Sequence, residues 1–408
     1  MNLRPYQIQL SDKATAMVNA RGIVYCAMEM RVGKTLIALQ TAANVGAKRV
    51  LFATKKKAIA SVRGDYDNGG YGFDLTVTNY EQLHNLTGGY DCIIADEAHS
   101  FGAFPKPSLR AKELRRLTGN APLILLSGTP SPESYSQLYH QFWLSGNSPF
   151  KHKNFYRWAD EFVTVRDKHL AGRVLKDYSN ADHRGIMAVI GDYFVRFTQA
   201  DAGFNQAEVR EMVQYVDTDT RIGRLVAALL KDRYYRMKDG AEIVCDTPVK
   251  LQSKIHQIYS GTVITESGDA RNLVASKIEY IKQNYAGRKI AIFHKFTAEG
   301  NALRAAFPTA TDSPEVFARC AEAVFVCQIA AGAMGINLSS ADVLIFYNID
   351  FSSQLYWQAR ARLSDKNRTT PPLVHWLFSR GGIEEKIYKA VIQKKDYTNY
   401  YFQRDYLK

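Results

Sequence analysis

The side chains best suited to chemistry lie in two short stretches, MEMRVGKT at residues 28–35 and DEAH at residues 96–99. In a Gly-Lys-Thr turn, backbone N–H groups can wrap phosphates and Lys34 can reach the β and γ phosphates, while Thr35 offers its hydroxyl to Mg²⁺. Asp96 can hold the metal, and Glu97 can orient or deprotonate an attacking water. Together the two stretches predict a site that binds and hydrolyses a nucleoside triphosphate.

Both stretches follow apolar runs that predict buried strands, at residues 23–26 and 92–95. After Thr35, apolar residues at helical spacing predict a helix that packs on the same sheet. The phosphate loop would then end at a helix N-terminus, where the helix dipole favours anions. The carboxylates would lie at the carboxyl end of a sheet strand, which faces the ligand crevice in open α/β folds.

The composition limits the class of protein. The chain has 408 residues, of which 46% are hydrophobic, enough for two or three domains. No apolar segment approaches the ~20 residues of a membrane helix, and the start lacks a signal-peptide core. Five scattered cysteines argue against a disulfide framework or a zinc site, so we expect a cytoplasmic protein.

The net charge points to the partner. A formal charge of +13 and an isoelectric point near 9.3 make a polyanion, and nucleic acid in particular, the expected ligand.

Strand-like runs alternate with amphipathic segments in two blocks, which predicts an α/β protein with two doubly wound parallel-sheet lobes. The runs lie at residues 23–26, 50–53, 92–95 and 123–126, and again at 290–293, 324–326, 343–346 and 373–376. Residues 150–197 are rich in aromatic and charged residues without a convincing strand, which favours a helical insertion. We therefore expect an N-terminal ATP-binding lobe at 1–149, an insertion and linker at 150–215, and a second lobe at 216–408.

With these residues in view, the chain resembles the superfamily-two helicases and translocases, in particular the Snf-type branch, nearly from end to end. That family has RecA-like lobes and a DEAH-type second motif. The sequence at residues 54–59 and 127–143 looks most like compact members encoded by bacteriophages and prophages. If the protein is phage-encoded, we expect it in the host cytoplasm. The segments similar to its ordered motifs are residues 3–7, 28–35, 50–57, 78–81, 96–99, 127–130, 293–296, 332–338 and 358–362.

The resemblance implies a role for each matching residue. ATP would be bound by Gln7, which reads adenine, and by Met30, Arg31, Val32, Gly33, Lys34, Thr35 and Asp96. Thr35 and Asp96 would hold Mg²⁺, and Glu97, Gln358, Arg360 and Arg362 would act in catalysis. The residues expected to contact nucleic acid are Thr54, Lys55, Lys56, Lys57, Thr78, His294 and Lys295.

Two positions depart from the Snf-type pattern. Met28 stands where the first motif usually opens on Gly or Ala. Asp365 stands where the last motif usually has a second arginine, which is therefore missing or replaced by Arg360 or Arg368. An aspartate facing the γ-phosphate would be repulsive, so we expect Asp365 to point away from it.

The leading interpretation is a monomeric, nucleic-acid-dependent ATPase that translocates on DNA or unwinds or remodels it. An alternative is an ATP-switched binding module that acts with a nuclease or another partner protein in replication or recombination. A third interpretation is a small-molecule kinase, but that function would not explain the second lobe. The sequence shows no wedge or hairpin for strand separation, and DNA versus RNA stays open.

Overall fold

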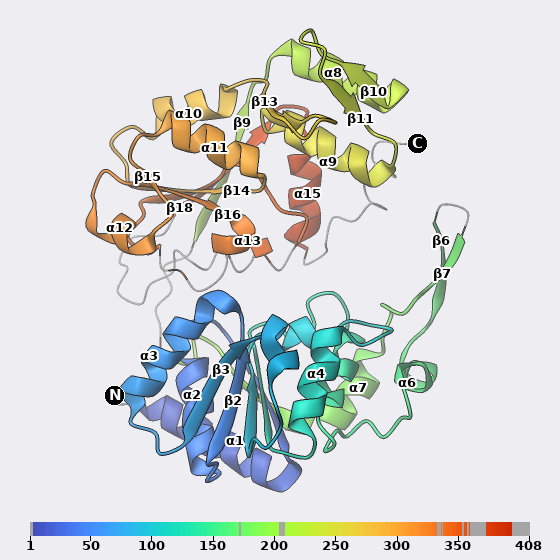
Figure 1. The fold of residues 1–408 in the computed structure, drawn as a ribbon, viewed down its shortest axis with the longest axis vertical. Helices are drawn as coiled ribbons and strands as arrows, with labels where there is room; N and C mark the ends of the chain where they lie inside the picture. The colour runs from blue at the N-terminus through green and yellow to red at the C-terminus, as the bar shows by residue number, and fades with distance from the viewer. Residues whose placement is uncertain are drawn as a thin grey trace. The chain divides into compact units, whose positions relative to one another are not determined.

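The computed structural model describes residues 3–170, 173–203, 209–332, 336, 338–352, 355–356, 359 and 373–393. The chain divides into two compact units, Met1–Phe204 (unit 1) and Asn205–Lys408 (unit 2), as Figure 1 shows. None of the described helices is both long enough and apolar enough to span a bilayer.

Unit 1 is built on a six-stranded parallel sheet with the strand order β3-β2-β4-β5-β1-β8. Its strands are β1 (Ile23–Met28), β2 (Arg49–Thr54), β3 (Asp74–Asn79), β4 (Cys92–Ala95), β5 (Leu123–Ser127) and β8 (Phe194–Phe197). The four strands predicted for this lobe are confirmed, and β3 and β8 are additions. The doubly wound parallel-sheet class is therefore confirmed for this unit.

Helices cover both faces of this sheet. The helices of unit 1 are α1 (Pro5–Arg21), α2 (Lys34–Asn44), α3 (Ile59–Gly69), α4 (Leu109–Thr118), α5 (Gln137–Trp143), α6 (Phe155–Phe162) and α7 (His183–Ile190), with 3₁₀ turns η1 (Lys56–Ala58), η2 (Tyr80–Asn85), η3 (Ala98–Phe101) and η4 (Gly191–Tyr193). Cys26 of β1 shares a core cluster with Ile37 of α2. The preceding residue, Tyr25, shares another cluster with Leu114 of α4 and Ile186 of α7. Burial on both faces explains why the strands read as uninterrupted apolar runs.

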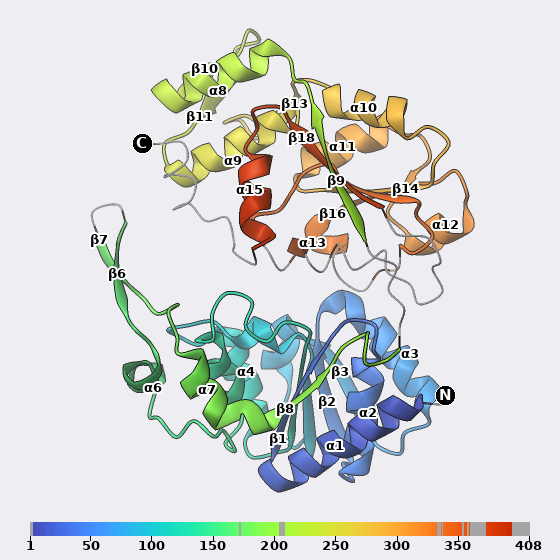
Figure 2. The same cartoon turned by 180° about the vertical axis from the view of Figure 1, so that it is seen from behind.

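The aromatic segment after residue 149 differs from the expected all-helical insertion. It contains the antiparallel strands β6 (Arg166–Leu170) and β7 (Arg173–Asp177), a hairpin that extends away from the rest of unit 1 in Figures 1 and 2. The sequence did not reveal this hairpin, and a role for it in strand separation is not tested. Strand β8 pairs with β1, and Trp158 is buried in the core cluster of unit 1. Aromatic residues that the sequence assigned to an insertion thus help to complete the first core.

Unit 2 has a second six-stranded parallel sheet, with the order β15-β16-β14-β17-β18-β9. Its strands are β9 (Arg210–Val216), β14 (Ile290–His294), β15 (Ala310–Thr311), β16 (Val324–Gln328), β17 (Val343–Phe346) and β18 (Leu373–Ser379). All four strands predicted for the second lobe are confirmed. The edge strand β9 lies in the stretch that the sequence assigned to a linker.

The remaining elements of unit 2 are short strand pairs and helices. They are α8 (Thr220–Asp232), β10 (Tyr234–Arg236), β11 (Glu242–Val244), α9 (Pro248–Tyr259), β12 (Thr262–Ile264), β13 (Ala270–Asn272), α10 (Ser276–Asn284), α11 (Thr297–Ala306), α12 (Pro314–Arg319), α13 (Ile329–Gly332) and α15 (Glu384–Val391).

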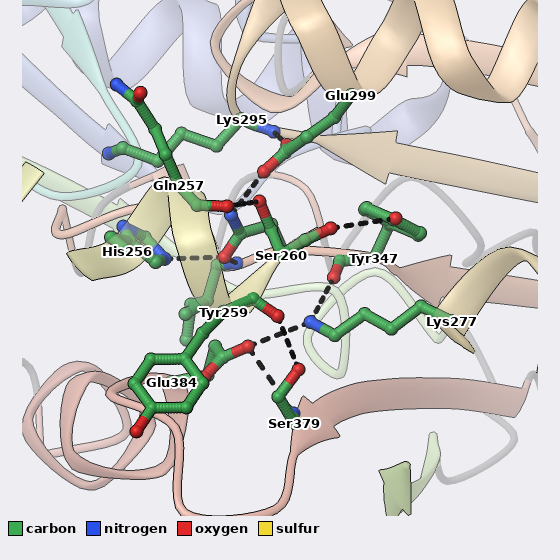
Figure 3. A network of polar contacts seen from close by, with 12 residues as sticks. His256, Gln257, Tyr259, Ser260, Lys277, Lys295, Glu299, Tyr347, Ser379 and Glu384 are labelled. Atoms are coloured by element: carbon green, nitrogen blue, oxygen red, sulfur yellow. Dashed lines mark hydrogen bonds and ion pairs between the residues drawn. The ribbon is translucent and has the colours of Figure 1, made fainter. Parts of the chain in front are cut away.

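A buried ion pair connects helices α10 and α15 to the end of strand β17 (Figure 3). The Lys277 Nζ on α10 lies 2.8 Å from Glu384 Oε1 on α15, and the two side chains are 2% and 1% exposed. Lys277 also donates to the carbonyl of Tyr347, directly after β17, at 2.9 Å. The pair therefore fixes two helices against the end of a central strand.

Removal of this lysine should destabilise unit 2 strongly. In the Lys277→Met variant, the Glu384 carboxylate stays buried without its cation, which should lower the free energy of unfolding by about 3–5 kcal/mol. The matched control is Lys282→Met on the same helix, where an exposed pair with Glu279 (3.4 Å) should contribute at most about 1 kcal/mol. Urea denaturation of both variants makes the comparison, and equal stabilities would contradict the role given to Lys277.

Candidate active site

Two residues of the loop between β1 and α2, Arg31 and Gly33, have a left-handed backbone conformation. Gly33 has φ = +85°, and a Cβ at this position would collide with the Gln7 amide, so only glycine fits. Among the described residues, the non-glycine positions with positive φ are Arg31 in this loop, Glu97 and Arg233. Such conformations cost on the order of 1–3 kcal/mol each and gather at functional sites. Helix α2 begins at Lys34, directly after the loop, so its N-terminus can bind an anion.

The lysine of this loop lies at the carboxyl edge of the sheet. Lys34 Nζ donates to the carbonyls of Met28 and Glu29, each at 3.0 Å. The loop after β5 approaches closely because Gly128 has no side chain. A Cβ on Gly128 would lie 3.4 Å from the Met28 carbonyl oxygen and 4.0 Å from Lys34 Nζ. The ammonium group is therefore held beside the ends of two neighbouring strands.

Helix α1 supports the same loop from its N-terminal turn. The Gln7 Nε2 donates to the carbonyl of Val32 at 3.2 Å, and the Gln7 Oε1 accepts from Arg4 N at 2.9 Å. Tyr6 OH also donates to the carbonyl of Val32, at 3.2 Å. Both ends of the Gln7 amide are thus bound to backbone atoms of unit 1. Gln7 therefore contacts the loop between β1 and α2, and its expected recognition of adenine stays a prediction.

Asp96 follows β4 and is held in one orientation. Its Oδ2 accepts from Thr54 Oγ1 at 2.7 Å, and its Oδ1 accepts from Glu97 N at 2.9 Å. Burial and the neighbouring Glu97 carboxylate raise the pKa of Asp96, whereas the Lys34 ammonium acts in the opposite direction. Lys34 and Asp96 therefore lie close enough for the lysine charge to affect the pKa of the carboxyl group. A divalent cation would offset both causes of the raised pKa, so the donor set fits Mg²⁺.

His99 joins the acidic pair to the loop after β5. Its Nδ1 lies 2.9 Å from Ser127 Oγ and 3.4 Å from Glu97 Oε2. Ser127 Oγ in turn accepts from Thr129 N at 3.1 Å. Burial, with a smaller contribution from the Lys55 charge, lowers the pKa of His99 to about 3, so the ring is neutral. His99 therefore links the acidic pair after β4 to the loop that follows β5.

The residues of unit 1 expected to touch nucleic acid separate into two groups. Lys56 and Lys57 are exposed and Lys55 is half-buried, in and beside the turn that follows β2. Thr54 is fully buried with its hydroxyl on Asp96, because β2 lies next to β4, and Thr78 is only 8% exposed. The buried Thr54 hydroxyl therefore orients the Asp96 carboxylate, and the expected contacts of these residues with nucleic acid stay predictions.

The residues of unit 2 expected to touch nucleic acid have partners inside that unit. His294 is 3% exposed with its Nδ1 3.0 Å from the carbonyl of Phe296, and burial lowers its pKa to about 4. Lys295 Nζ lies 2.7 Å from Asp350 Oδ2. The expected contacts of both residues with nucleic acid stay predictions. Gln358, Arg360 and Arg362 lie outside the described residues, as do Asp365 and Arg368.

A pocket of about 320 Å³, which was not predicted from the sequence, adjoins this site within unit 1. Glu29 of the phosphate loop and Gly128 contribute to its lining. Tyr135, Phe194 and Arg196 contribute from later parts of the chain. These residues come from separate stretches, so no local pattern could have predicted the pocket.

No family model matches this chain. Over 83 residues it is 39% identical to the chromatin-remodeling ATPase INO80 of Neurospora crassa, and 39% identical over the same length to that of Aspergillus oryzae. The similarity covers 20% of this chain but only 4% and 5% of these relatives. The SWI2/SNF2 ATPase core domain of Sulfolobus solfataricus aligns with 97% of this chain and 89% of its own, at 18% identity and a TM-score of 0.43. The local sequence similarity agrees with the resemblance to Snf-type ATPases, while the likeness to phage-encoded members stays a prediction.

The neutral His99 makes the stability of unit 1 depend on pH. The unfolded chain takes up a proton near pH 6.5, but the folded chain does so only near pH 3. The free energy of unfolding should therefore fall as the pH drops below 6.5, by about 2 kcal/mol at pH 5 from this residue alone. The His99→Gln variant should lack this pH-dependent contribution. Urea titrations should therefore show that the difference in free energy of unfolding between wild type and variant is smaller at pH 5 than at pH 7. If the free energy of unfolding changed equally with pH in wild type and variant, the assignment of a neutral His99 in the folded protein would be contradicted.

Proposed function

We propose that this chain is a nucleic-acid-dependent ATPase that couples ATP hydrolysis to translocation on DNA, or to its remodelling or unwinding. The observation that carries the proposal is the placement of Lys34 and Asp96 beside the ends of strands that flank β5 in one parallel sheet. A lysine in a phosphate cradle and a fixed carboxylate are the two parts that an ATP·Mg²⁺ site needs.

The binding step rests on groups that unit 1 already orients. Lys34 would exchange its two carbonyl partners for the β and γ phosphates of ATP, and the N-terminus of α2 would receive phosphate oxygens. Thr35 and Asp96 would hold Mg²⁺, which supplies charge neutralisation when bound. Thr54 keeps the Asp96 carboxylate in place through its hydroxyl. Mg²⁺ usually keeps waters and phosphate oxygens as its other ligands, so few protein ligands suffice.

The hydrolytic step would depend on Glu97. Its backbone is held in the left-handed conformation, and its carboxylate lies 3.4 Å from the neutral His99 ring. Such a carboxylate can orient a water and accept its proton. By the resemblance, Gln358, Arg360 and Arg362 would add positive charge and hydrogen bonds to the transition state.

The nucleic-acid partner is supported by charge and by the relatives. The chain carries a formal charge of +13, and the exposed Lys56 and Lys57 follow a strand end at the edge of the sheet where Asp96 lies. The relatives with local sequence similarity are named as chromatin-remodeling ATPases, which favours DNA over RNA. A grip through lysines on phosphates would be largely independent of sequence and strongly dependent on salt.

Substitution of the two key charged residues should separate binding from hydrolysis. The Glu97→Gln variant should bind ATP but hydrolyse it at least about 100-fold more slowly, because the general base is lost. The Lys34→Ala variant should lose measurable ATP binding, since the ammonium that meets the phosphates is gone. Turnover assays and calorimetric ATP titrations measure the two effects, with Glu113→Gln on α4 as control. Retained turnover in Glu97→Gln would remove that residue from its assigned role.

Added DNA should stimulate ATP turnover, and the lysines after β2 should set its salt dependence. Loss of Lys56 and Lys57 to alanine should weaken DNA binding and reduce the slope of log affinity against log salt by about 2. The matched control removes two other exposed lysines of unit 1, Lys13 and Lys112, and should leave the slope unchanged.

Rates of ATP hydrolysis with single-stranded, duplex and forked DNA and with RNA, at one salt concentration, identify the nucleic acid that stimulates the enzyme. ATPase activity that does not rise with any nucleic acid would contradict the proposal.

A displacement assay distinguishes a translocating ATPase (a motor) from an ATP-switched binding module. A motor should displace a bound roadblock from DNA or a third strand from a triplex during ATP hydrolysis. Stimulated hydrolysis without displacement would favour the alternative of an ATP-switched binding module.

A further inference from the structure

Lys295 connects the ends of three neighbouring strands in unit 2. Its backbone N–H, just after β14, donates to Glu299 Oε2 at 2.8 Å. Its carbonyl accepts from Gln328 Nε2, at the end of β16, at 2.7 Å. Its ammonium group lies 2.7 Å from Asp350 Oδ2, four residues beyond the end of β17. Figure 3 shows Lys295 and Glu299 within the polar network around these strand ends.

The segment at residues 347–352, which follows β17, is fixed at successive positions. Asn348 Nδ2 donates to Glu299 Oε1 at 2.6 Å, and Asn348 Oδ1 contacts the ring of His256. Asp350 Oδ1 accepts from Ser352 N at 3.0 Å, while its Oδ2 meets Lys295. The segment is therefore bound to other elements of unit 2 by side chains as well as by its own turn.

The Lys295–Asp350 pair is shielded more than an ordinary surface pair. The side chains are 14% and 19% exposed, and the Lys295 ammonium lies 4.1 Å from the centre of the Phe351 ring. Partial burial strengthens the attraction between the charges and limits screening by salt. Lys295 thus acts on the segment through two consecutive residues.

We propose that Lys295 is a positioning residue for ATP hydrolysis. Through Asp350 it fixes the segment from which the chain continues, six residues after Ser352, to Gln358 and on to Arg362. The inference rests on the proposed function, in which those residues act on the bound phosphates. It is an alternative to the expectation that the Lys295 side chain contacts nucleic acid, and it rests on the ion pair of the ammonium group with Asp350.

Two substitutions distinguish positioning from phosphate contact. Lys295→Met and Asp350→Asn both break the pair, so under positioning both should lower the kcat of DNA-stimulated ATP hydrolysis by about tenfold or more. The KM for ATP and the DNA concentration for half-maximal stimulation should change less than about twofold. If Lys295 instead contacts phosphate, Lys295→Met should raise the half-saturating DNA concentration and Asp350→Asn, which frees the lysine, should lower it. That opposite response would overturn the proposal.

Rescue and a matched control guard against simple loss of folding. The charge-reversed pair Lys295→Glu with Asp350→Lys should recover much of the kcat that the single variants lose. The conservative variant Lys295→Arg should retain most of the wild-type kcat. The control, Lys389→Met, breaks an exposed pair with Glu385 of 2.8 Å in the same unit and should leave kcat unchanged. Urea midpoints of all variants show whether unit 2 stays folded. Failure of both rescues in folded variants would count against the proposal.

Amide hydrogen exchange tests the inference without relying on activity. In Lys295→Met and Asp350→Asn, residues 347–352 should exchange at least about fivefold faster, while the strands of unit 2 keep wild-type protection. The charge-reversed pair should restore slow exchange. If wild type shows no nucleic-acid-stimulated ATPase, the proposed function fails, but this result still reports whether Lys295 orders the segment. Unchanged exchange in both single variants would overturn the positioning role.

Discussion

The structure of unit 1 depends on one constraint, which is that all six strands of its sheet run in the same direction. Every strand then ends at the same edge, and the loops that follow β1, β5 and β4 lie side by side there. Because helices cover both faces of such a sheet, its carboxyl edge is the natural place for polar side chains. Asp96 and Ser127 lie at or directly after strand ends, and the Lys34 ammonium reaches the end of β1 from the start of α2, which is why residues far apart in sequence meet.

Partial burial gives this edge its chemistry. Removal of water raises the pKa of Asp96 and lowers that of His99, so one group favours a cation nearby and the other stays neutral. Hydrogen bonds with Thr54 and Ser127 hold these two groups without adding charge. The positive φ of Arg31 and Glu97 shows that the surrounding contacts determine the backbone there.

Unit 2 repeats the parallel sheet but uses the corresponding edge differently. Its charged side chains are paired with one another, as in Lys295 with Asp350 and Lys277 with Glu384. Such pairs order the segment after β17, where the backbone leaves the sheet. The two units therefore share an architecture, while the described polar groups at this edge of unit 2 mainly hold its own loops.

The sequence by itself determined the eight predicted strands and the turn around Gly33, because apolar runs and a glycine between a strand and a helix are local signals. Only the tertiary structure decided which side chains meet. The hydroxyl of Thr54 reaches Asp96 because β2 and β4 are neighbours, and Lys295 reaches Asp350 because β14 and β17 are neighbours. Strand order depends on long-range packing rather than on local pattern. For the same reason, the sequence could not assign Trp158 and β8 to the first core or foresee the hairpin of β6 and β7.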